Sequence, residues 1–487
     1  MLIKVERKPE KFLPNFKRVI LRFLFYSDER ARVIIPKVMK STDDEIQQSL
    51  ETTLRDFSRR HRSITRTFLS HYEKILHLLA EFKVDTENLS LERKLVLGSY
   101  FTMEYSIESA AFFNPSIVES PDQQNLEPGM KRVIISFRAI GEGHISSIVF
   151  RQGIIDSNCN FKFDADSYFV RDAEILRHHP YEKKKFIERL KKRNIPSELI
   201  EAVTGPLPDT FTYRQLEDSV EKYSAEKKEV KDQSFLVRLL WSADVYHEIN
   251  FSYDTNISER VIFPVTSAES NGIEDARFVR FTDDDGKVTF YATYTAYNGR
   301  EISPKILETK DFYHFTFRPL YGEGARNKNL ALFPRKINGQ YVMLSRIDGI
   351  RNYIMTSDEL NIWEKPKLLQ EPEYPWEFVQ IGNCGSPLET EHGWLVITHG
   401  VGPVRRYSLG ATLLDLNDPS IVIGRMKEPL LVANDDEREG YVPNVIYTCG
   451  SMLHNGNLVL PYGESDYSTG FATVNLSDLL EKIRNGK

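Results

Sequence analysis

Residues 338–346 read NGQYVMLSR, a unit in which a turn leads into an apolar strand that ends in a charged residue. The same unit, with a polar or charged residue at the end of the strand, recurs at 129–138 (GMKRVIISFR), 285–294 (DGKVTFYATY), 392–399 (HGWLVITH) and 455–462 (NGNLVLPY). Five such units at a spacing of roughly fifty residues, with one long interruption, are typical of a β-propeller. A simple meander of hairpins could also produce weak repetition. We predict an all-β fold, a five-bladed β-propeller, for the part of the chain that carries these units.

The residues before the repeated units have a helical pattern. A capping box at 41–45 (STDDE) precedes apolar residues at helical spacing, and a second run places Ile64, Phe68, Tyr72, Ile75 and Leu79 on one face. A third run opens at Ser90 and continues to Phe113. We therefore predict a helical N-terminal region over residues 1–112 and a propeller catalytic domain over 113–487.

One long segment, about 161–260, interrupts the repeats. Its middle parts, 181–192 and 213–231, are rich in charge and prone to form helices, and Pro196, Pro206 and Pro208 break them. We predict a partly helical insertion within or between the first blades. It could form a lid, an oligomer contact or a solvent-exposed addition without a further role.

Composition excludes several classes of function. The formal net charge of −6 and the pI near 6.1 lack the excess of positive charge that is typical of proteins that bind nucleic acid. The three cysteines, Cys159, Cys384 and Cys449, are far apart and favour a reducing compartment. Basic residues interrupt the apolar residues of the N-terminus, so no signal peptide is expected, and no stretch reaches the length of a membrane span. We expect a cytoplasmic protein without membrane contact, and the sequence leaves a homo-oligomer possible.

The most informative chemical motif is Gly272-Ile273-Glu274-Asp275-Ala276-Arg277, which follows the apolar run 261–265. It sets two adjacent carboxylates and an arginine beside a predicted buried strand. Carboxylic acids placed in this way cleave glycosidic bonds by protonating the leaving oxygen. An isolated motif of this kind is more often an N-cap or a surface salt bridge.

Polar residues at the ends of the inner strands of a propeller converge on its central channel. Taken singly, each such residue could be structural: a strand-end salt bridge, a core histidine or a turn cap. Together they predict an acid surrounded by cations, which a structural role does not require. The residues expected to face this channel are Arg138, Asp275, Arg277, Arg346, His399 and Asp466.

The ordered motifs resemble glycoside hydrolase family 130, the mannoside phosphorylases and mannosidases built on a five-bladed propeller. The resemblance covers roughly two-thirds of the chain, excluding the first hundred residues and the insertion. The segments that carry it are 114–118, 137–139, 272–277, 327–334, 393–394, 398–401, 407, 410–415, 418–419, 442–445 and 462–466.

The resemblance implies roles for individual residues. Asp275 matches the catalytic acid, which donates a proton to the glycosidic oxygen directly or through a sugar hydroxyl. The matching substrate-binding residues are Asn114, Arg138, Glu274, Arg277 and Asp466, of which Asp466 holds mannose hydroxyls. The residues that match the phosphate site are Asn327, Lys328, Arg346, His399 and Tyr407. No metal or cofactor is implied beyond inorganic phosphate as co-substrate.

Two positions depart from the family pattern. Ala276 stands where a proline usually follows the two acids, and Ser345 stands where a histidine usually precedes the arginine. The first departure is expected to make the loop that positions the acid less rigid. The second puts one phosphate or sugar contact in doubt.

The expected reaction is inverting phosphorolysis of β-mannosides in a mannose-containing oligosaccharide, giving α-mannose 1-phosphate. A phosphorylase replaces the water and its activating carboxylate with an anion, which cations must hold in line. Arg346, Lys328 and His399 are the expected cations. One alternative is an inverting β-mannosidase, with Glu437, Glu464 or Asp466 activating water. The other is a glycan-binding propeller without activity.

Overall fold

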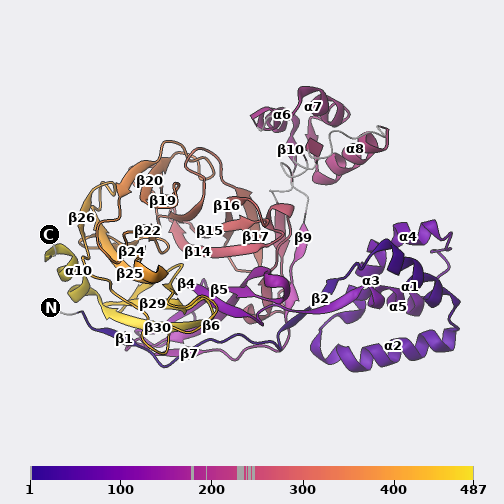
Figure 1. The fold of residues 1–487 in the computed structure, drawn as a ribbon, viewed down its shortest axis with the longest axis horizontal. Helices are drawn as coiled ribbons and strands as arrows, with labels where there is room; N and C mark the ends of the chain where they lie inside the picture. The colour runs from indigo at the N-terminus through magenta and orange to yellow at the C-terminus, as the bar shows by residue number, and fades with distance from the viewer. Residues whose placement is uncertain are drawn as a thin grey trace.

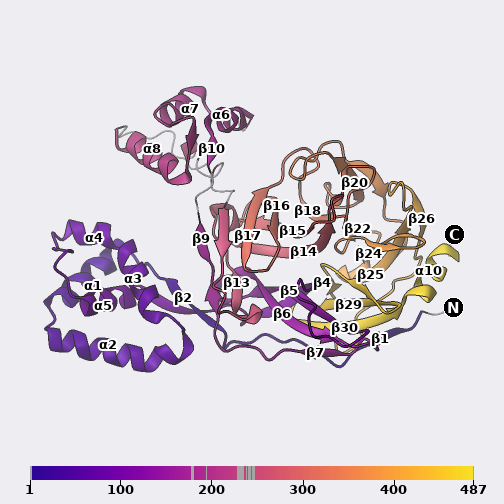
Figure 2. The same ribbon diagram turned by 180° about the vertical axis from the view of Figure 1, so that it is seen from behind.

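The structure is a computed structural model that describes residues 3–176, 180–192, 195–226 and 247–485, with positions 235, 236, 239 and 243. These residues form a large, mostly β-sheet body, a helical lobe that contains the helices between residues 28 and 100, and a small lobe that stands out from the body (Figure 1). Figure 2 shows the same separation from behind. Among the helices of the described ranges, none combines the length and apolar character needed to cross a bilayer.

The body contains five groups of antiparallel strands. Each of the five repeated sequence units forms a strand near the middle of one group, namely β5 (Lys131–Ile140), β15 (Val288–Tyr297), β19 (Tyr341–Arg346), β24 (Gly393–Val401) and β29 (Asn457–Glu464). Each of these strands pairs with a strand from earlier in the chain, namely β4 (Ala111–Glu119), β14 (Gly272–Thr282), β18 (Lys328–Leu332), β22 (Gln380–Asn383) and β27 (Ile446–Tyr447). The repeat found in the sequence is therefore a repeat of sheet structure.

The remaining strands complete the groups. They are β6 (Ser146–Ile155), β7 (Phe161–Phe163), β16 (Ile302–Thr309), β17 (His314–Pro319), β20 (Asn352–Ser357), β21 (Lys367–Gln370), β23 (Leu388–Thr390), β25 (Tyr407–Leu414), β26 (Val422–Arg425), β28 (Met452–His454) and β30 (Ser468–Asn475). The first two groups are hydrogen-bonded into one sheet, to which β8 (Arg171–Asp172), β9 (Glu174–Leu176), β12 (His247–Asn250) and β13 (Arg260–Ile262) also belong. Apolar side chains of neighbouring strands fill the space between the groups and bury almost all of the central strands.

The N-terminus returns to the last group. β1 (Val5–Arg7) pairs antiparallel with β30, so the outermost strand of the C-terminal group comes from the start of the chain. We call residues 5–18, which run from β1 along the body toward the helical lobe, the N-terminal arm. Helix α10 (Leu476–Asn485) follows β30 and packs on β25 and β26.

The helical lobe has its own apolar core and joins the body through β2 (Val19–Phe23), which pairs with β3 (Thr102–Ser106). Its helices are α1 (Asp28–Lys40), α2 (Asp43–Phe57), α3 (Ile64–Lys74), α4 (Leu76–Glu81) and α5 (Leu91–Tyr100). The predicted capping box is confirmed at Thr42 and Glu45, and Ser90 is the N-cap of α5. The helical prediction for residues 101–113 is wrong: α5 ends at Tyr100, because the apolar residues that follow are used by β3 and β4.

The small lobe is the middle part of the predicted insertion, whose two ends form strands of the body sheet, β7 to β9 and β12. It contains β10 (Tyr181–Glu182), α6 (Lys183–Lys192), α7 (Ser197–Thr204), β11 (Thr210–Phe211) and α8 (Tyr213–Glu226) around a separate apolar core. The end of the second predicted helical stretch, 227–231, lies outside the described residues. The lobe leaves the body after β9 and returns at β12, and these two strands pair antiparallel with Leu176 opposite Glu248. The insertion therefore emerges from the tip of a hairpin at the edge of the sheet.

Candidate active site

Three strands that pair with the repeated units, β4, β14 and β18, each contain a shift in pairing register. The register shifts between Phe113 and Ser116 in β4, between Glu274 and Arg277 in β14, and between Lys328 and Ala331 in β18. Such β-bulges leave residues out of the ladder and re-aim their side chains. Each shift adjoins or contains residues with left-handed backbone: Asn114 (φ 50°), Asp275 (φ 54°), Asn327 (φ 61°) and Asn329 (φ 67°). Asn and Asp tolerate this conformation better than other non-glycine residues, which explains their presence at the bulges.

The bulges open onto a cavity of about 200 Å³. Four cationic and two carboxylate side chains line it, together with amide, imidazole and phenol groups. Its lining residues are Asn114, Arg138, Asp275, Lys328, Asn329, Arg346, Gln380, His399, Arg405, Tyr407, Val445, Tyr447 and Asp466. Eight of the eleven residues predicted from the sequence are among them. Within the described ranges, no lining residue comes from before Asn114.

Asp275 lies among hydrogen-bond donors and cations. The Asn114 amide donates to Asp275 Oδ1 at 2.7 Å, and Arg138 NH1 lies 3.5 Å from the same oxygen. Burial acts to raise the pKa of Asp275, but Arg138, Lys328, Arg277 and the Asn114 hydrogen bond together lower it below its usual value. These surroundings therefore hold Asp275 as a carboxylate.

Glu274 and Arg277 support the site from outside its lining. Glu274 accepts from Arg138 at 2.7 Å and from Lys328 at 2.6 Å, so one buried carboxylate fixes two cations of the cavity. Arg277 is buried and donates to the Tyr447 hydroxyl at 2.6 Å. Asn327 does not line the cavity; an added Cβ on Gly349 would lie 3.2 Å from its Nδ2.

Arg346 and His399 form the other wall. Arg346 NH1 and His399 Nε2 are 3.1 Å apart, and the Nε of Arg346 is buried without a hydrogen-bond partner. Within the described residues, Arg346 thus pairs with an imidazole and not with a carboxylate. Its pKa is lowered by burial, which shows how poorly its charge is compensated. An anion in the cavity would supply the missing partner.

His399 is neutral in this arrangement. Burial, Arg346 and Arg277 hold its pKa well below the usual value, so the prediction that His399 is a cation is wrong. Because Nε2 accepts from Arg346, the proton is on Nδ1, which lies 3.5 Å from Cys384 Sγ. Gly382 permits this position: a Cβ there would lie 2.3 Å from the imidazole ring. Tyr407 stacks on the ring at 5.9 Å between centroids.

Asp466 reaches the cavity from the turn between β29 and β30. Burial raises its pKa to about 6, and the nearby Asp275 and Glu274 charges act in the same direction against Arg138 and Arg405. The two cavity carboxylates therefore have opposite pKa shifts.

Sequence reasoning missed five lining residues. Gln380, Asn329, Arg405, Val445 and Tyr447 line the cavity although none was predicted to do so. Asn329 and Val445 lie inside segments that carried the family resemblance, so their motifs offered a signal. Gln380 donates to the Tyr407 hydroxyl at 3.5 Å, and Asn329 donates to the Tyr447 hydroxyl at 2.9 Å. Arg405 follows another left-handed residue, Val404, which sequence patterns do not reveal.

The two departures from the family pattern have different surroundings. Ala276 is buried within the bulge of β14, beside the acid. Ser345 is fully buried and its hydroxyl lies 3.7 Å from Met355 Sδ, so it makes no contact with the cavity.

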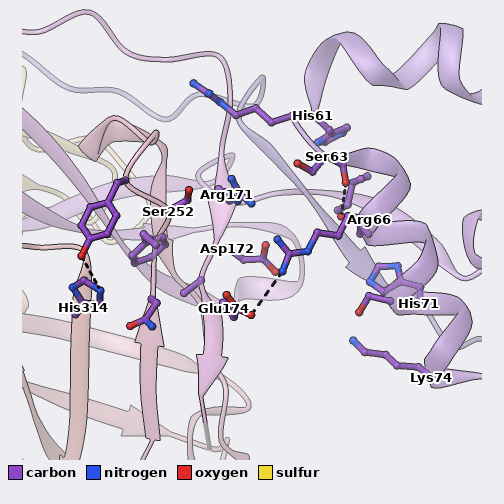
Figure 3. Close-up of a pocket in the computed structure, with 18 residues that line it drawn as sticks. His61, Ser63, Arg66, His71, Lys74, Arg171, Asp172, Glu174, Ser252 and His314 are labelled. Carbon is purple, nitrogen blue, oxygen red and sulfur yellow. Dashed lines mark hydrogen bonds and ion pairs between the residues drawn. The ribbon is translucent and has the colours of Figure 1, made fainter.

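A larger cleft lies elsewhere, between α3 and the strands β8, β9 and β12 (Figure 3). Its volume is about 610 Å³, and its walls mix cations with carboxylates; Arg66 lies 3.7 Å from Glu174. None of the residues predicted for the active site lines it. In the part of the chain that the structure describes, no group of three or more His, Cys, Asp or Glu side chains is arranged to hold a metal ion.

Comparison with known proteins gives one family. The profile of glycoside hydrolase family 130, described as beta-1,4-mannooligosaccharide phosphorylase, matches residues 220–485. A 1,2-beta-oligomannan phosphorylase of Thermoanaerobacter sp. (strain X514) is 35% identical over 237 residues, which cover 47% of this chain and 76% of the relative. A beta-1,2-mannobiose phosphorylase of Listeria innocua is 30% identical over 254 residues, covering 51% of this chain and 68% of the relative.

The solved structure of a beta-1,2-mannobiose phosphorylase from Listeria innocua, in complex with beta-1,2-mannobiose, has a TM-score of 0.46 and 21% identity to this chain. The similarity covers 78% of this chain and 93% of that one. The family profile begins at residue 220, so Asn114 and Arg138, which the structure brings to Asp275, lie outside it. The profile nevertheless covers more than half of the sequence, including Asp275, Arg346, His399 and Asp466. The chain belongs to glycoside hydrolase family 130.

Proposed function

We propose that the protein is an inverting glycoside phosphorylase that cleaves β-mannosides with inorganic phosphate and releases α-mannose 1-phosphate. The observation that carries the proposal is Arg346, a cavity-lining arginine with a buried, unpartnered Nε and no carboxylate partner among the described residues. A phosphate dianion would accept charge-assisted hydrogen bonds from this guanidinium. Lys328 lines the same cavity and would add a second cation.

The remaining residues then have separate roles. Asp275 protonates the departing glycosidic oxygen, directly or through a sugar hydroxyl, while phosphate attacks the anomeric carbon from the opposite face of the ring. Asp466, Asn114 and Arg138 bind sugar hydroxyls. Neutral His399 and Tyr407 orient Arg346 and the phosphate. Inversion at the anomeric carbon converts the β-mannoside to the α-phosphate.

Two of the three carboxylates considered for a hydrolytic mechanism are engaged elsewhere. Glu437 pairs with Arg7 at 2.6 Å, Glu464 pairs with Lys11 at 2.5 Å, and neither lines the cavity. Asp466 does line it, and its raised pKa favours the alternative that it activates water in an inverting β-mannosidase. The excess of cations over carboxylates in the cavity favours phosphate.

The architecture proposed for this reaction is a five-bladed propeller. Five strand groups, each with one repeated unit, support it, as does the pairing of β1 with β30, which joins the two ends of the body.

A cytoplasmic location belongs to the same proposal, because phosphate is available there and the three cysteines are buried and unpaired. Inorganic phosphate is the proposed co-substrate, without a further cofactor.

The test is a product analysis with β-1,2- and β-1,4-mannobiose, with and without phosphate. We expect mannose 1-phosphate in amounts equal to the mannose released, and no cleavage without phosphate. Release of two mannose molecules at the same rate in phosphate-free buffer would assign the protein to the hydrolases.

Arg346→Ala tests the observation that carries the proposal. Loss of a charge-assisted contact worth about 1.5–3 kcal/mol should raise the KM for phosphate about tenfold to a hundredfold. The KM for the mannoside should change much less, because the lost contact is to the anion. The matched control is Arg351→Ala, an exposed arginine in the following turn that pairs with Asp348 and Glu371. An equal rise in both KM values for R346A would remove Arg346 from the phosphate site.

A further inference from the structure

The turn that carries Asp466 has an uncommon sequence for its backbone. Glu464 to Tyr467 connect β29 to β30, and the Tyr467 N–H donates to the Glu464 carbonyl at 3.0 Å. Both central residues are left-handed: Ser465 has φ 49° and Asp466 has φ 51°. Type I′ hairpin turns require this backbone and usually place Asn-Gly there. Left-handed backbone costs a residue other than glycine about 1–2 kcal/mol, so contacts around the turn must fix it.

One of these contacts comes from Lys11 in the N-terminal arm. Lys11 Nζ lies 2.5 Å from an oxygen of Glu464, the first residue of the turn, and Glu464 is only 5% exposed. Ser468, just after the turn, donates to the same carboxylate at 2.8 Å. Phe12 and Thr469 exchange two backbone hydrogen bonds, at 2.9 and 3.0 Å. The arm therefore holds both flanks of the turn.

Arg7 supplies the second contact through Glu437. Its guanidinium donates to both carboxylate oxygens of Glu437, at 2.6 and 2.9 Å. The main-chain carbonyl of Glu437 accepts the Ser465 hydroxyl at 2.6 Å. A bidentate pair has a defined geometry, so Arg7 fixes the segment to which the first left-handed residue of the turn is bonded.

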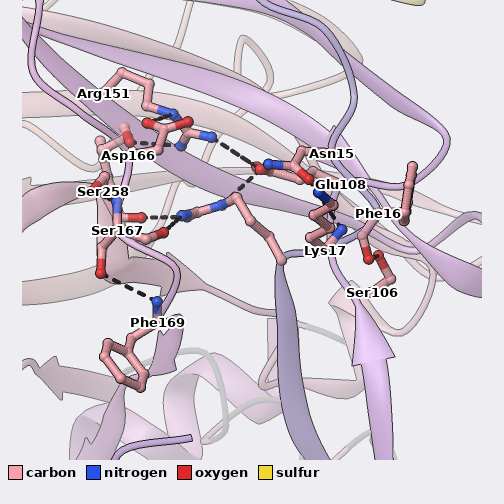
Figure 4. Close-up of polar contacts among 12 residues, drawn as sticks. Asn15, Phe16, Lys17, Ser106, Glu108, Arg151, Asp166, Ser167, Phe169 and Ser258 are labelled. Atoms are coloured by element: carbon pink, nitrogen blue, oxygen red, sulfur yellow. Dashed lines mark hydrogen bonds and ion pairs between the residues drawn. The ribbon is translucent and has the colours of Figure 1, made fainter. Parts of the chain in front are cut away.

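The other end of the arm is anchored in a buried ion network (Figure 4). Arg18 is 1% exposed and its Nε lies 2.7 Å from Glu108. Arg151 shares Glu108 at 3.0 Å and also pairs with Asp166 at 2.6 Å. Removing one member of such a network would leave a buried charge uncompensated. The arm is thus held at both ends, and it lies outside the residues matched by the family profile.

We propose that Arg7 and Lys11 are positioning residues that hold the Ser465-Asp466 turn, so that the N-terminal arm sets affinity for the sugar and not for phosphate. The proposal rests on the sugar-binding role of Asp466 in the proposed function. The phosphate wall is built from β19 and β24, and among the described residues no hydrogen bond or ion pair of the arm reaches these strands.

The deciding variant is Lys11→Met, because the Lys11 side chain is 41% exposed and its loss leaves the apolar core intact. We expect the KM for β-mannobiose to rise about tenfold, as loss of a contact worth about 1.4 kcal/mol requires. The KM for phosphate should stay within about twofold of the wild-type value. Arg7→Met should act in the same direction, and Lys11→Arg should restore the wild-type KM. Lys4→Met, at an exposed position just before the arm, is the matched control and should behave as wild type.

Hydrogen–deuterium exchange provides a readout that does not depend on turnover. In K11M, amide exchange in residues 464–469 should accelerate, while exchange around Asp275 stays unchanged. Equal changes in both KM values, or unchanged exchange at the turn, would overturn the proposal. If the wild-type protein fails to phosphorolyse mannosides, the proposed function is wrong, and the exchange of the turn in K11M still decides whether the arm positions it.

Discussion

Asp275 faces opposing demands in the proposed reaction. The surrounding cations keep its pKa low, so the residue is ionised. A general acid must carry a proton when the glycosidic bond breaks. A bound phosphate dianion compensates the charge of Lys328, and this weakens the attraction that holds Asp275 ionised. Binding of the nucleophile therefore prepares the acid.

This coupling predicts a phosphate-dependent pH profile. The alkaline limb of the rate, where Asp275 loses its proton, should lie at higher pH with saturating phosphate than with limiting phosphate. The shift should be visible in kcat/KM for the mannoside measured at both phosphate concentrations. An alkaline limb that does not move with phosphate would contradict the coupling.

Asp275→Asn should abolish this limb and lower turnover by at least about a hundredfold, as loss of a general acid does. Asn keeps the side-chain shape and tolerates φ 54°, so the fold should stay intact. Circular dichroism and mannose binding provide the controls. Activity close to that of the wild type would remove Asp275 from the mechanism.

Asp466 predicts a pH dependence of stability. Its folded-state pKa, raised to about 6, exceeds the usual value of about 3.9, so the folded state binds more protons between these values. Stability from this group is present below about pH 4 and lost as the pH rises through about 6. Asp466→Asn cannot ionise, so its Tm should exceed that of the wild type by a few degrees above pH 6. The two proteins should converge near pH 4. A Tm difference that is constant with pH would contradict the raised pKa.

At the scale of the strand, the bulges of β4 and β14 present the same backbone with different sequences. Left-handed Asn114 is followed by Pro115 in β4, whereas left-handed Asp275 is followed by Ala276 in β14. The bulge keeps both following residues out of the ladder, so the N–H of Ala276 is not needed for pairing with β15. Proline is acceptable where no such hydrogen bond is lost.

Ala276→Pro should therefore be tolerated. We expect unchanged kcat and a gain in stability of about 0.4–1 kcal/mol, because proline restricts the unfolded chain. Chemical denaturation and initial rates would measure both quantities. Ala292→Pro is the control, since Ala292 pairs within the ladder of β15 and its substitution should destabilise strongly. A loss of stability in A276P comparable to that of A292P would show that the bulge is not open at this position.

At the scale of the whole molecule, the insertion is separable from the site. Its apolar core is distinct from those of the body, and no residue of the lobe lines the cavity within the described ranges. Because β9 and β12 are hydrogen-bonded neighbours, a short turn can connect them.

Replacing residues 177–246 by a four-residue Gly/Asn turn should leave the body folded, with a similar kcat on β-mannobiose. The measurements are thermal unfolding and steady-state kinetics. The comparison is a variant that is changed in the helical lobe and keeps the insertion intact. A folded but inactive deletion variant would show that the lobe contributes to catalysis.

The sequence predicted what depends on local pattern and on motifs. The five repeated units could be found because each is a turn followed by an apolar strand, and Asp275 because two acids and an arginine are adjacent. It could not predict the pairing of Arg7 with Glu437 or of Arg18 with Glu108, because these contacts join residues far apart in the chain. Nor could it show that His399 is neutral, which follows from its burial beside two arginines.

The end of the last predicted helix of the N-terminal region was also placed too late, for a physical reason. Residues 101–113 are apolar enough to continue a helix, and only their partners, β2 and the strands of the body, make them strands. The cavity-lining residue Arg405 was missed because its position depends on backbone conformation at Val404, which the residue type does not suggest.

The position of the insertion also affects where the boundaries of the catalytic domain would be placed. The family profile starts at residue 220, within the insertion, although β4 and β5 on its far side supply Asn114 and Arg138 to the cavity. A fragment cloned to the boundaries of the profile would keep the acid, Lys328 and Arg346 but lack one wall of the cavity and the N-terminal arm. Loss of activity in such a fragment would say nothing about the residues it retains.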